Sequence, residues 1–174
     1  MAKLKIAITG PESTGKSTLT EKLAEHYNSK LIPEMARSYL QELERPYEYS
    51  DLLEIAKTQK KTSEETFSNN QGNIFSDTSL LTLEIWSKDK FDTCDPWILN
   101  QIKKERFDLY LLCNTDTKWV YDKLREDEHR RKELFNMYEV LLKAYGFEYK
   151  IISGLGKERL QNAIKAIELY QSES

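Results

Sequence analysis

An eight-residue stretch near the start of the chain, Gly10-Pro11-Glu12-Ser13-Thr14-Gly15-Lys16-Ser17, constrains the fold more than any other feature. It matches the phosphate-loop (P-loop) pattern G-x-x-x-x-G-K-S/T at every fixed position. Residues 4–9 before it are mostly apolar and include β-branched side chains, which indicates a buried strand. The residues after it carry apolar side chains at helical spacing, which indicates a helix from Lys16. This order of strand, turn and helix is the context that a phosphate loop requires.

The loop predicts binding of a nucleoside triphosphate, which we expect to be ATP. Glycine allows close backbone approaches, and successive N–H groups of such a loop form a nest for anions. Lys16 is expected to reach the β- and γ-phosphates, and the Ser17 hydroxyl to bind Mg²⁺. A glycine-rich turn without a ligand is the alternative, but the strand, helix, lysine and serine are all in place. The expected nucleotide-binding residues are Gly10, Glu12, Ser13, Thr14, Gly15, Lys16, Ser17 and Thr18.

Length and composition place the chain in a broad class. Its 174 residues fit a single domain, 1–174, and the net charge of −3 argues against a nucleic-acid partner. No apolar run is long enough to cross a bilayer and no signal peptide fits before the first strand, so we expect a cytoplasmic protein without a membrane partner. Cys94 and Cys113 make no disulfide framework. Whether copies form a homo-oligomer stays open.

Apolar runs alternate with helical periodicity along the whole chain. Strands are expected at 4–9, 30–33, 74–77, 108–113 and 149–152. Helices are expected from residue 16, at 34–43, from an N-cap at Ser50 to about 69, at 79–90, from 95, at 119–126, at 131–144 and at 158–170. The alternation predicts an α/β protein with the P-loop NTPase fold: three α/β/α layers, a five-stranded parallel sheet and a short helical lid at about 114–132.

Ligands of such sheets bind at the carboxyl ends of the strands, and one expected strand ends on Asp77. An acid at this position holds Mg²⁺ directly or through water, although Asp77 could instead cap the helix beginning near Ser79. The next residue is Thr78 rather than the glutamate that activates water in many ATPases. This difference favours transfer to a bound acceptor.

Glu34 and Arg37 follow the second expected strand and are three residues apart, on one helical face. Glu34 is a candidate to hold an acceptor hydroxyl and to act as its general base; the alternative is a first-turn carboxylate that complements the helix dipole. Arg37 is a candidate to clamp the substrate or a phosphate, and an ion pair with Glu34 is its alternative.

A run of charged residues between 122 and 132 follows the fourth expected strand. Small kinases close an arginine-bearing lid over the transferring phosphate, and Arg125 is the preferred candidate, ahead of Arg131 and Arg130. The alternative for most of this run is a solvated helix face. The aromatic residues that could stack on a flat ring, none of them favoured singly, are Tyr39, Tyr49, Trp86, Trp97 and Trp119.

The chain resembles the ribosylnicotinamide kinase domain of the bacterial NadR-type proteins of NAD biosynthesis, over nearly its whole length. The segments that carry the resemblance are the loop at 10–17, Pro33 to Tyr39, Tyr49 to Asp51 with Ile55, Ala56 and Gln59, Asp77-Thr78, and Trp119 to Arg125. The resemblance implies ATP- and Mg²⁺-dependent phosphorylation of the 5′-hydroxyl of nicotinamide riboside. The implied catalytic residues are Lys16, Glu34, Asp77 and Arg125; the implied substrate-binding residues are Glu34, Arg37 and Asp77, and the metal ligands Ser17 and Asp77.

Two other functions stay open on the same scaffold. The acceptor could be another nucleoside or a nucleotide, or the protein could be an ATP-binding switch or ATPase without a small-molecule acceptor. Asn114-Thr115-Asp116-Thr117 lacks the lysine of the guanine-reading N-K-x-D pattern, which argues against a GTP-dependent switch.

Overall fold

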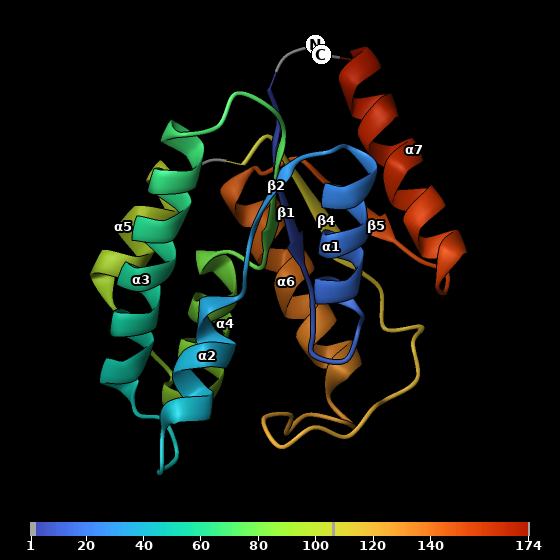
Figure 1. Cartoon of the computed structure of the whole chain (residues 1–174). Helices are drawn as coiled ribbons and strands as arrows, with labels where there is room; N and C mark the ends of the chain where they lie inside the picture. Colours follow the sequence, from blue (N-terminus) through green and yellow to red (C-terminus); the bar gives the residue numbers. More distant parts are fainter. Residues whose placement is uncertain (1–2, 106, 174) are drawn as a thin grey trace.

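The fold is seen in a computed structural model that describes residues 3–105 and 107–173. Its sheet has five parallel strands, as the sequence predicted, and their order is β2-β3-β1-β4-β5 (Figure 1). The strands are β1 (Lys5–Thr9), β2 (Lys30–Ile32), β3 (Ile74–Asp77), β4 (Leu109–Cys113) and β5 (Tyr149–Ile152).

Helices cover both faces of the sheet and complete the three layers (Figure 1). They are α1 (Lys16–His26), α2 (Met35–Glu42), α3 (Tyr49–Ser68), α4 (Leu80–Phe91), α5 (Pro96–Lys104), α6 (Arg131–Tyr145) and α7 (Lys157–Glu173). One face is packed by α1 and α7, the other by α3, α4, α5 and α6. Among the described residues, no helix combines the length and the apolar character that a bilayer span needs.

Alternating side chains of the central strands divide the core between the two faces. Ile6 and Ile8 of β1 join the cluster under α1 and α7, whereas Ala7 faces the opposite cluster. Every residue of β4 is buried, because both faces of the sheet are covered. Cys113 in this strand and Cys94 are both buried and free, consistent with the absence of a disulfide framework.

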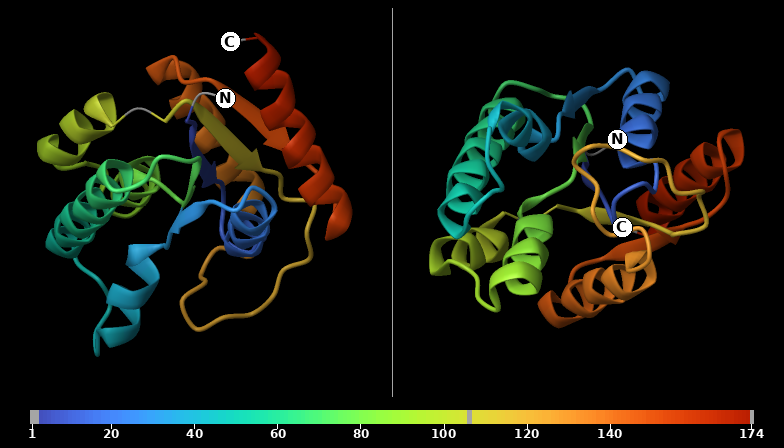
Figure 2. Two further views of the ribbon diagram at one scale, coloured as in Figure 1. Left: turned by 45° about the horizontal axis from the view of Figure 1, so that its top comes forward. Right: turned by 90° about the horizontal axis from the view of Figure 1, so that it is seen from below.

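The carboxyl ends of the strands meet at the end of the sheet seen in the right view of Figure 2. Ile8 of β1 pairs in register with Asp77 of β3, and Thr9 pairs with Leu112 of β4. The phosphate loop therefore leaves the sheet between the acidic tip of β3 and the end of β4. The predicted strand positions thus bring the loop and Asp77 side by side.

The start of α3 differs from the prediction. The helix begins at Tyr49 with Glu48 as its N-cap, so the predicted N-cap at Ser50 is wrong. The reason is a capping box between Glu48 and Asp51, in which the Glu48 N–H donates to Asp51 Oδ2 at 2.7 Å. Asp51 also accepts hydrogen bonds from Arg45 and from the Tyr39 hydroxyl, which joins α2 to α3.

The predicted helix at 119–126 is absent, and the lid is not helical before α6 begins. Residues 114–130, all of them described, form turns and irregular chain. Their backbone amides are used elsewhere: Leu124 N–H donates to Asp122 Oδ1 at 3.0 Å, and the amides of Glu126 and Asp127 donate to the Glu12 carboxylate. These hydrogen bonds replace the backbone hydrogen bonds that a helix would need, so no helix forms.

Glu105, the C-cap of α5, is a buried carboxylate at the other end of the sheet from the loop. Its Oε1 accepts no hydrogen bond from the residues that the structure describes. Burial raises the pKa of Glu105 from 4.5 to about 7, opposed by Lys60 and the Ser63 hydroxyl. A raised acid pKa means that the protonated form stabilises the fold. That stability is complete below pH 4.5 and is lost as pH rises through 7.

Glu105→Gln should therefore stabilise the protein at high pH more than at low pH. Relative to the wild type, we expect its free energy of unfolding to gain up to about 3 kcal/mol between pH 5 and pH 9, measured by urea unfolding. Glu54→Gln, which changes an exposed carboxylate of α3, is the matched control and should show no such gain. An equal effect of Glu105→Gln at both pH values would contradict the pKa assignment.

Candidate active site

The phosphate loop is held open by its own backbone and by contacts within it. Gly15 has φ of 77°, in the left-handed region that glycine adopts without strain. Lys16 Nζ and Thr14 Oγ1 each donate to the Pro11 carbonyl at 2.7 Å. None of the described side chains caps α1, so the first N–H groups of this helix are available to bind an anion.

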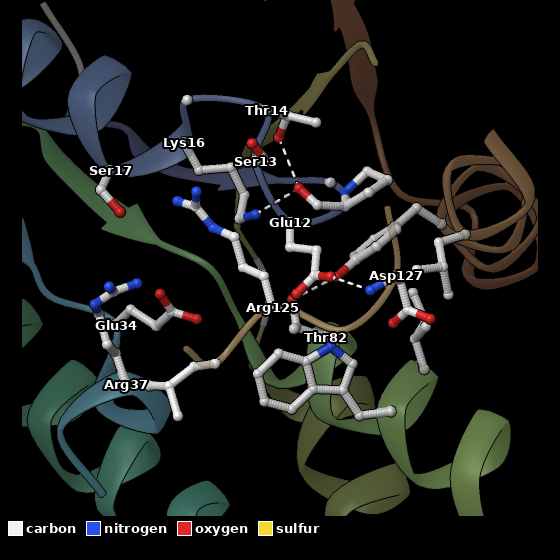
Figure 3. Close-up of a pocket in the computed structure, with 18 of the residues that line it drawn as sticks. Glu12, Ser13, Thr14, Lys16, Ser17, Glu34, Arg37, Thr82, Arg125 and Asp127 are labelled. Atoms are coloured by element: carbon white, nitrogen blue, oxygen red, sulfur yellow. Dashed lines mark hydrogen bonds between the residues drawn. The ribbon is translucent and has the colours of Figure 1, made fainter. Parts of the chain in front are cut away.

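A cavity lies beside the loop and is closed by four further segments (Figure 3). All eight predicted nucleotide-binding residues line it. The other lining residues are Pro11 of the loop; Glu34, Arg37 and Leu40 at α2; Thr82, Ile85 and Trp86 of α4; Leu134 and Tyr138 of α6; and Leu124, Arg125 and Asp127 of the lid. The cavity thus brings together the loop, α2 and the lid, as the sequence predicted.

Glu34 sits at the N-cap position of α2, but its side chain makes no capping hydrogen bond. It points across the cavity toward Lys16 and Arg125 instead (Figure 3). Desolvation raises the pKa of Glu34; Lys16 opposes this shift, and the nearby Asp77 carboxylate adds to it. The side chain is therefore placed for a ligand rather than for its own helix.

Asp77 lies behind the cavity lining at the tip of β3, where it is 5% exposed. Its Oδ1 accepts no hydrogen bond from the described residues, and burial raises its pKa against the opposing Ser17 hydroxyl. The N-cap of α4 is Ser79, so Asp77 does not have the alternative capping role. An unsatisfied carboxylate oxygen beside a serine hydroxyl fits Mg²⁺, which binds one or two carboxylates together with substrate phosphates.

No cluster of three or more metal-binding side chains occurs in the part of the chain that the structure describes.

Arg37 pairs with Asp122 of the lid, rather than with Glu34 as the alternative interpretation held. A hydrogen bond from the Leu124 amide, together with this ion pair, lowers the pKa of Asp122. The contact joins α2 to the lid across the opening of the cavity. Arg37 lines the cavity as predicted, but with part of its charge already neutralised.

Of the three candidate lid arginines, Arg125 alone lines the cavity. Its side chain extends toward Lys16 (Figure 3), and its Nη1 donates to the Val120 carbonyl at 2.6 Å. Arg130 turns away and pairs with Asp89. Arg131 lies behind the loop, where Nη1 donates to the Ser13 carbonyl at 3.1 Å.

Glu12 and Ser13 have a second role that the sequence did not reveal. Glu12 Oε1 accepts the amides of Glu126 at 2.8 Å and Asp127 at 2.5 Å, and Ser13 Oγ accepts the Val120 amide at 2.9 Å. Desolvation raises the pKa of Glu12 against these hydrogen bonds. The lid is thus closed onto the phosphate loop itself.

One wall of the cavity is mostly apolar and is formed by residues of α4 and α6, namely Thr82, Ile85, Trp86, Leu134 and Tyr138. The Tyr138 hydroxyl donates to Thr82 Oγ1 at 3.3 Å. Apart from Trp86, these residues were not predicted from the sequence, because their helical spacing is that of ordinary core residues. Of the other aromatic candidates, Tyr39 bonds to Asp51, Tyr49 packs on Phe91 and Trp119 lies under Arg131.

Comparison with known proteins shows the family of this chain. The sequence model of a family described as AAA domain matches residues 5–159. Two curated relatives, from Escherichia coli K12 and Salmonella typhimurium LT2, are each named trifunctional NAD biosynthesis/regulator protein NadR. Each is 32% identical over 150 residues, which is 83% of this chain and 37% of the relative. The chain therefore spans little more than a third of their length.

Solved structures of other proteins, a kinase among them, have the same fold. An NadR protein in complex with NR superimposes with a TM-score of 0.84 at 25% identity, covering 97% of this chain and 52% of that one. Deoxyadenosine kinase from M. mycoides, at 19% identity and a TM-score of 0.67, shares the fold over 95% of this chain and 99% of its own. The chain belongs to the AAA domain family of P-loop proteins, with NadR proteins among its relatives.

Proposed function

We propose that this chain is an ATP-dependent kinase that phosphorylates the 5′-hydroxyl of nicotinamide riboside, giving nicotinamide mononucleotide. The observation that carries the proposal is Glu34, a partly buried carboxylate without a capping role, facing Lys16 across the cavity. Such a pair suits transfer of a phosphoryl group to an alcohol. The choice of acceptor rests on the curated relatives, which are named for NAD biosynthesis, and on the similar solved structure of an NadR protein in complex with NR.

Each charged side chain has its own role in this proposal. Lys16 and the free amides of α1 bind the β- and γ-phosphates, and Arg125 neutralises charge on the transferring group. Glu34 orients the acceptor hydroxyl and takes its proton. Ser17 and Asp77 would hold Mg²⁺, which further neutralises the phosphates when bound.

The distribution of charge favours a nucleoside over a nucleoside monophosphate as acceptor. Among the described lining residues, the cations are Lys16, Arg37 and Arg125. Lys16 belongs to the phosphate loop, Arg37 is paired with Asp122, and Arg125 extends toward Lys16. With Lys16 and Arg125 engaged by the donor phosphates and Arg37 by Asp122, an acceptor phosphate near the Glu34 carboxylate would be repelled, whereas a neutral hydroxyl meets no such repulsion.

The apolar wall gives the ring of a nucleoside a place to pack. Trp86, Ile85 and Leu134 lie on the α4 and α6 side of the cavity, across from Glu34 of α2. A flat ring against Trp86 would bury apolar area while its ribose extends toward Glu34. This arrangement supports an acceptor with a planar base at one end and a primary alcohol at the other.

Coupled ATP turnover with a panel of acceptors tests the proposal. We expect turnover with nicotinamide riboside to exceed the rates with a deoxynucleoside, thymidine monophosphate and no acceptor. Lys16→Ala should abolish transfer and leave the circular dichroism spectrum unchanged, because this side chain binds phosphate and does not pack in the core. ATP turnover that no acceptor changes would contradict the proposal and favour an ATPase or switch.

Glu34→Gln should lower kcat by about 10²–10⁴-fold, the usual contribution of a general base. Glu34 accepts a proton only when ionised, and desolvation raises its pKa. Wild-type kcat should therefore fall as pH drops through this raised pKa, and the variant should lose this acid limb of the pH profile. An acid limb that persists unchanged in Glu34→Gln would assign it to another group and contradict the role of Glu34.

Arg125→Ala should lower kcat by about 10³-fold with little change in the KM of the acceptor, because the charge that it neutralises develops in the transition state. Arg130→Ala is the matched control: this neighbouring lid arginine pairs with Asp89 outside the cavity, so its loss should change kcat little. A change confined to the acceptor KM would show that Arg125 binds substrate without taking part in transfer.

A further inference from the structure

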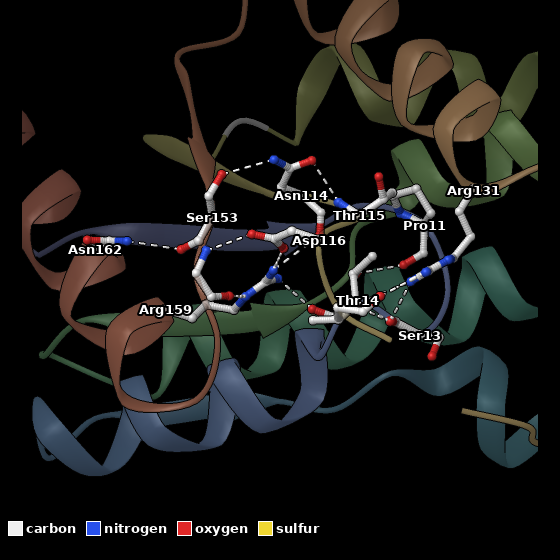
Figure 4. A network of polar contacts seen from close by, with 12 residues as sticks. Pro11, Ser13, Thr14, Asn114, Thr115, Asp116, Arg131, Ser153, Arg159 and Asn162 are labelled. Carbon is white, nitrogen blue, oxygen red and sulfur yellow. Dashed lines mark hydrogen bonds and ion pairs between the residues drawn. The ribbon is translucent and has the colours of Figure 1, made fainter. Parts of the chain in front are cut away.

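Arg159, in the first turn of α7, is a buried cation that the proposed reaction does not use. The residue is 4% exposed, and its guanidinium contacts four acceptors (Figure 4). Nε donates to the Gly154 carbonyl at 2.8 Å, Nη1 to the Thr14 carbonyl at 2.6 Å and Nη2 to the Asn114 carbonyl at 3.2 Å, and Asp116 forms an ion pair with it. Burial of a charge is costly unless its donors are satisfied, and these acceptors meet that need.

The contact with Thr14 reaches the phosphate loop from outside the cavity. Thr14 and Gly15 line the cavity, whereas Arg159 does not. A trans peptide is planar, so the Thr14 carbonyl and the Gly15 N–H point in opposite directions. Because the guanidinium holds the carbonyl on its own side of the loop, it directs the Gly15 N–H to the side away from α7.

The Thr14–Gly15 peptide needs contacts from other parts of the chain to fix its orientation. Gly15 is exposed, and a glycine limits its own backbone angles little. The preceding carbonyl, of Ser13, is held by Thr117 Oγ1 at 2.6 Å and by Arg131, which belong to the lid and the helix that follows it. Arg159 instead comes from α7, which packs against α1, and its guanidinium also contacts Asn114 and Asp116 at the start of the lid.

We propose that Arg159 is a positioning residue of the nucleotide site, which fixes the Thr14–Gly15 peptide so that the loop amides are already aimed at the phosphates before the nucleotide binds. Asp116 orients the guanidinium and also accepts the Gly154 amide at 2.7 Å. Pre-organisation of this kind improves affinity because less backbone freedom is lost on binding. The inference rests on one part of the proposed function, namely that the phosphate loop binds a nucleotide.

Binding of MgADP to Arg159→Met tests this role, by titration calorimetry at a temperature where circular dichroism shows the variant folded. We expect affinity to fall by about 10- to 100-fold, the equivalent of a lost hydrogen bond to a charged group. Arg159→Lys should recover part of the loss, because an ammonium group can bond to the Thr14 carbonyl. It also serves as the folded variant if Arg159→Met does not fold.

Ile167→Ala separates positioning from stability, since Ile167 is fully buried on the same helix and forms part of the core under α1 and α7. It should lower the thermal midpoint and leave MgADP affinity unchanged. Unchanged affinity in both Arg159 variants, or equal weakening in Ile167→Ala, would overturn the inference.

Hydrogen exchange of the nucleotide-free protein gives an independent readout. Amides at 10–17 should exchange faster in Arg159→Met than in the wild type and in Ile167→Ala. If the wild type does not bind MgADP, the proposed function fails, while loop exchange still decides the role of Arg159. Equal exchange in the wild type and Arg159→Met would overturn the positioning role.

Discussion

The backbone of the phosphate loop, packed directly against the end of β4, is the constraint on which the site depends. A Cβ at Gly10 would lie 2.9 Å from the Cys113 carbonyl oxygen, and Gly10 has φ of 133°, so a side chain has no room here. Cys113 ends the strand from which the lid departs. The nucleotide loop and the lid are therefore anchored at one point, and the acidic tip of β3 lies on the other side of β1.

The lid is closed by hydrogen bonds to the loop that it covers, not by packing of a helix. Glu12 and Ser13 accept lid amides, and the Arg37–Asp122 pair joins the far side of the lid to α2. These contacts bring Arg125 into the cavity, where Glu34 is partly buried. Exclusion of water strengthens the electrostatic interactions of the site and disfavours hydrolysis of the donor. Opening of the lid must break several of these hydrogen bonds. Entry of the substrate is therefore coupled to the contacts of the phosphate loop.

Local patterns made much of this structure predictable. The strand, loop and first helix follow from a fixed motif and its flanks, and the acid at 77 follows from the position of a strand end. What could not be predicted depends on distant contacts: within the helix expected at 119–126, the Val120 amide donates to Ser13 and the Glu126 amide to Glu12, each more than a hundred residues away. Glu48 is not a preferred N-cap residue, and it caps α3 through Asp51. Arg159 sits in an amphipathic helix, where an arginine suggests an exposed face.

A crystal structure with a non-hydrolysable ATP analogue and nicotinamide riboside tests the central claim most directly. The account predicts that the β- and γ-phosphates lie against the amides of residues 10–17 and Lys16, with the 5′-hydroxyl within hydrogen-bonding distance of the Glu34 carboxylate. Phosphates bound elsewhere, or Glu34 and Asp77 both turned away from the reacting atoms, would contradict it.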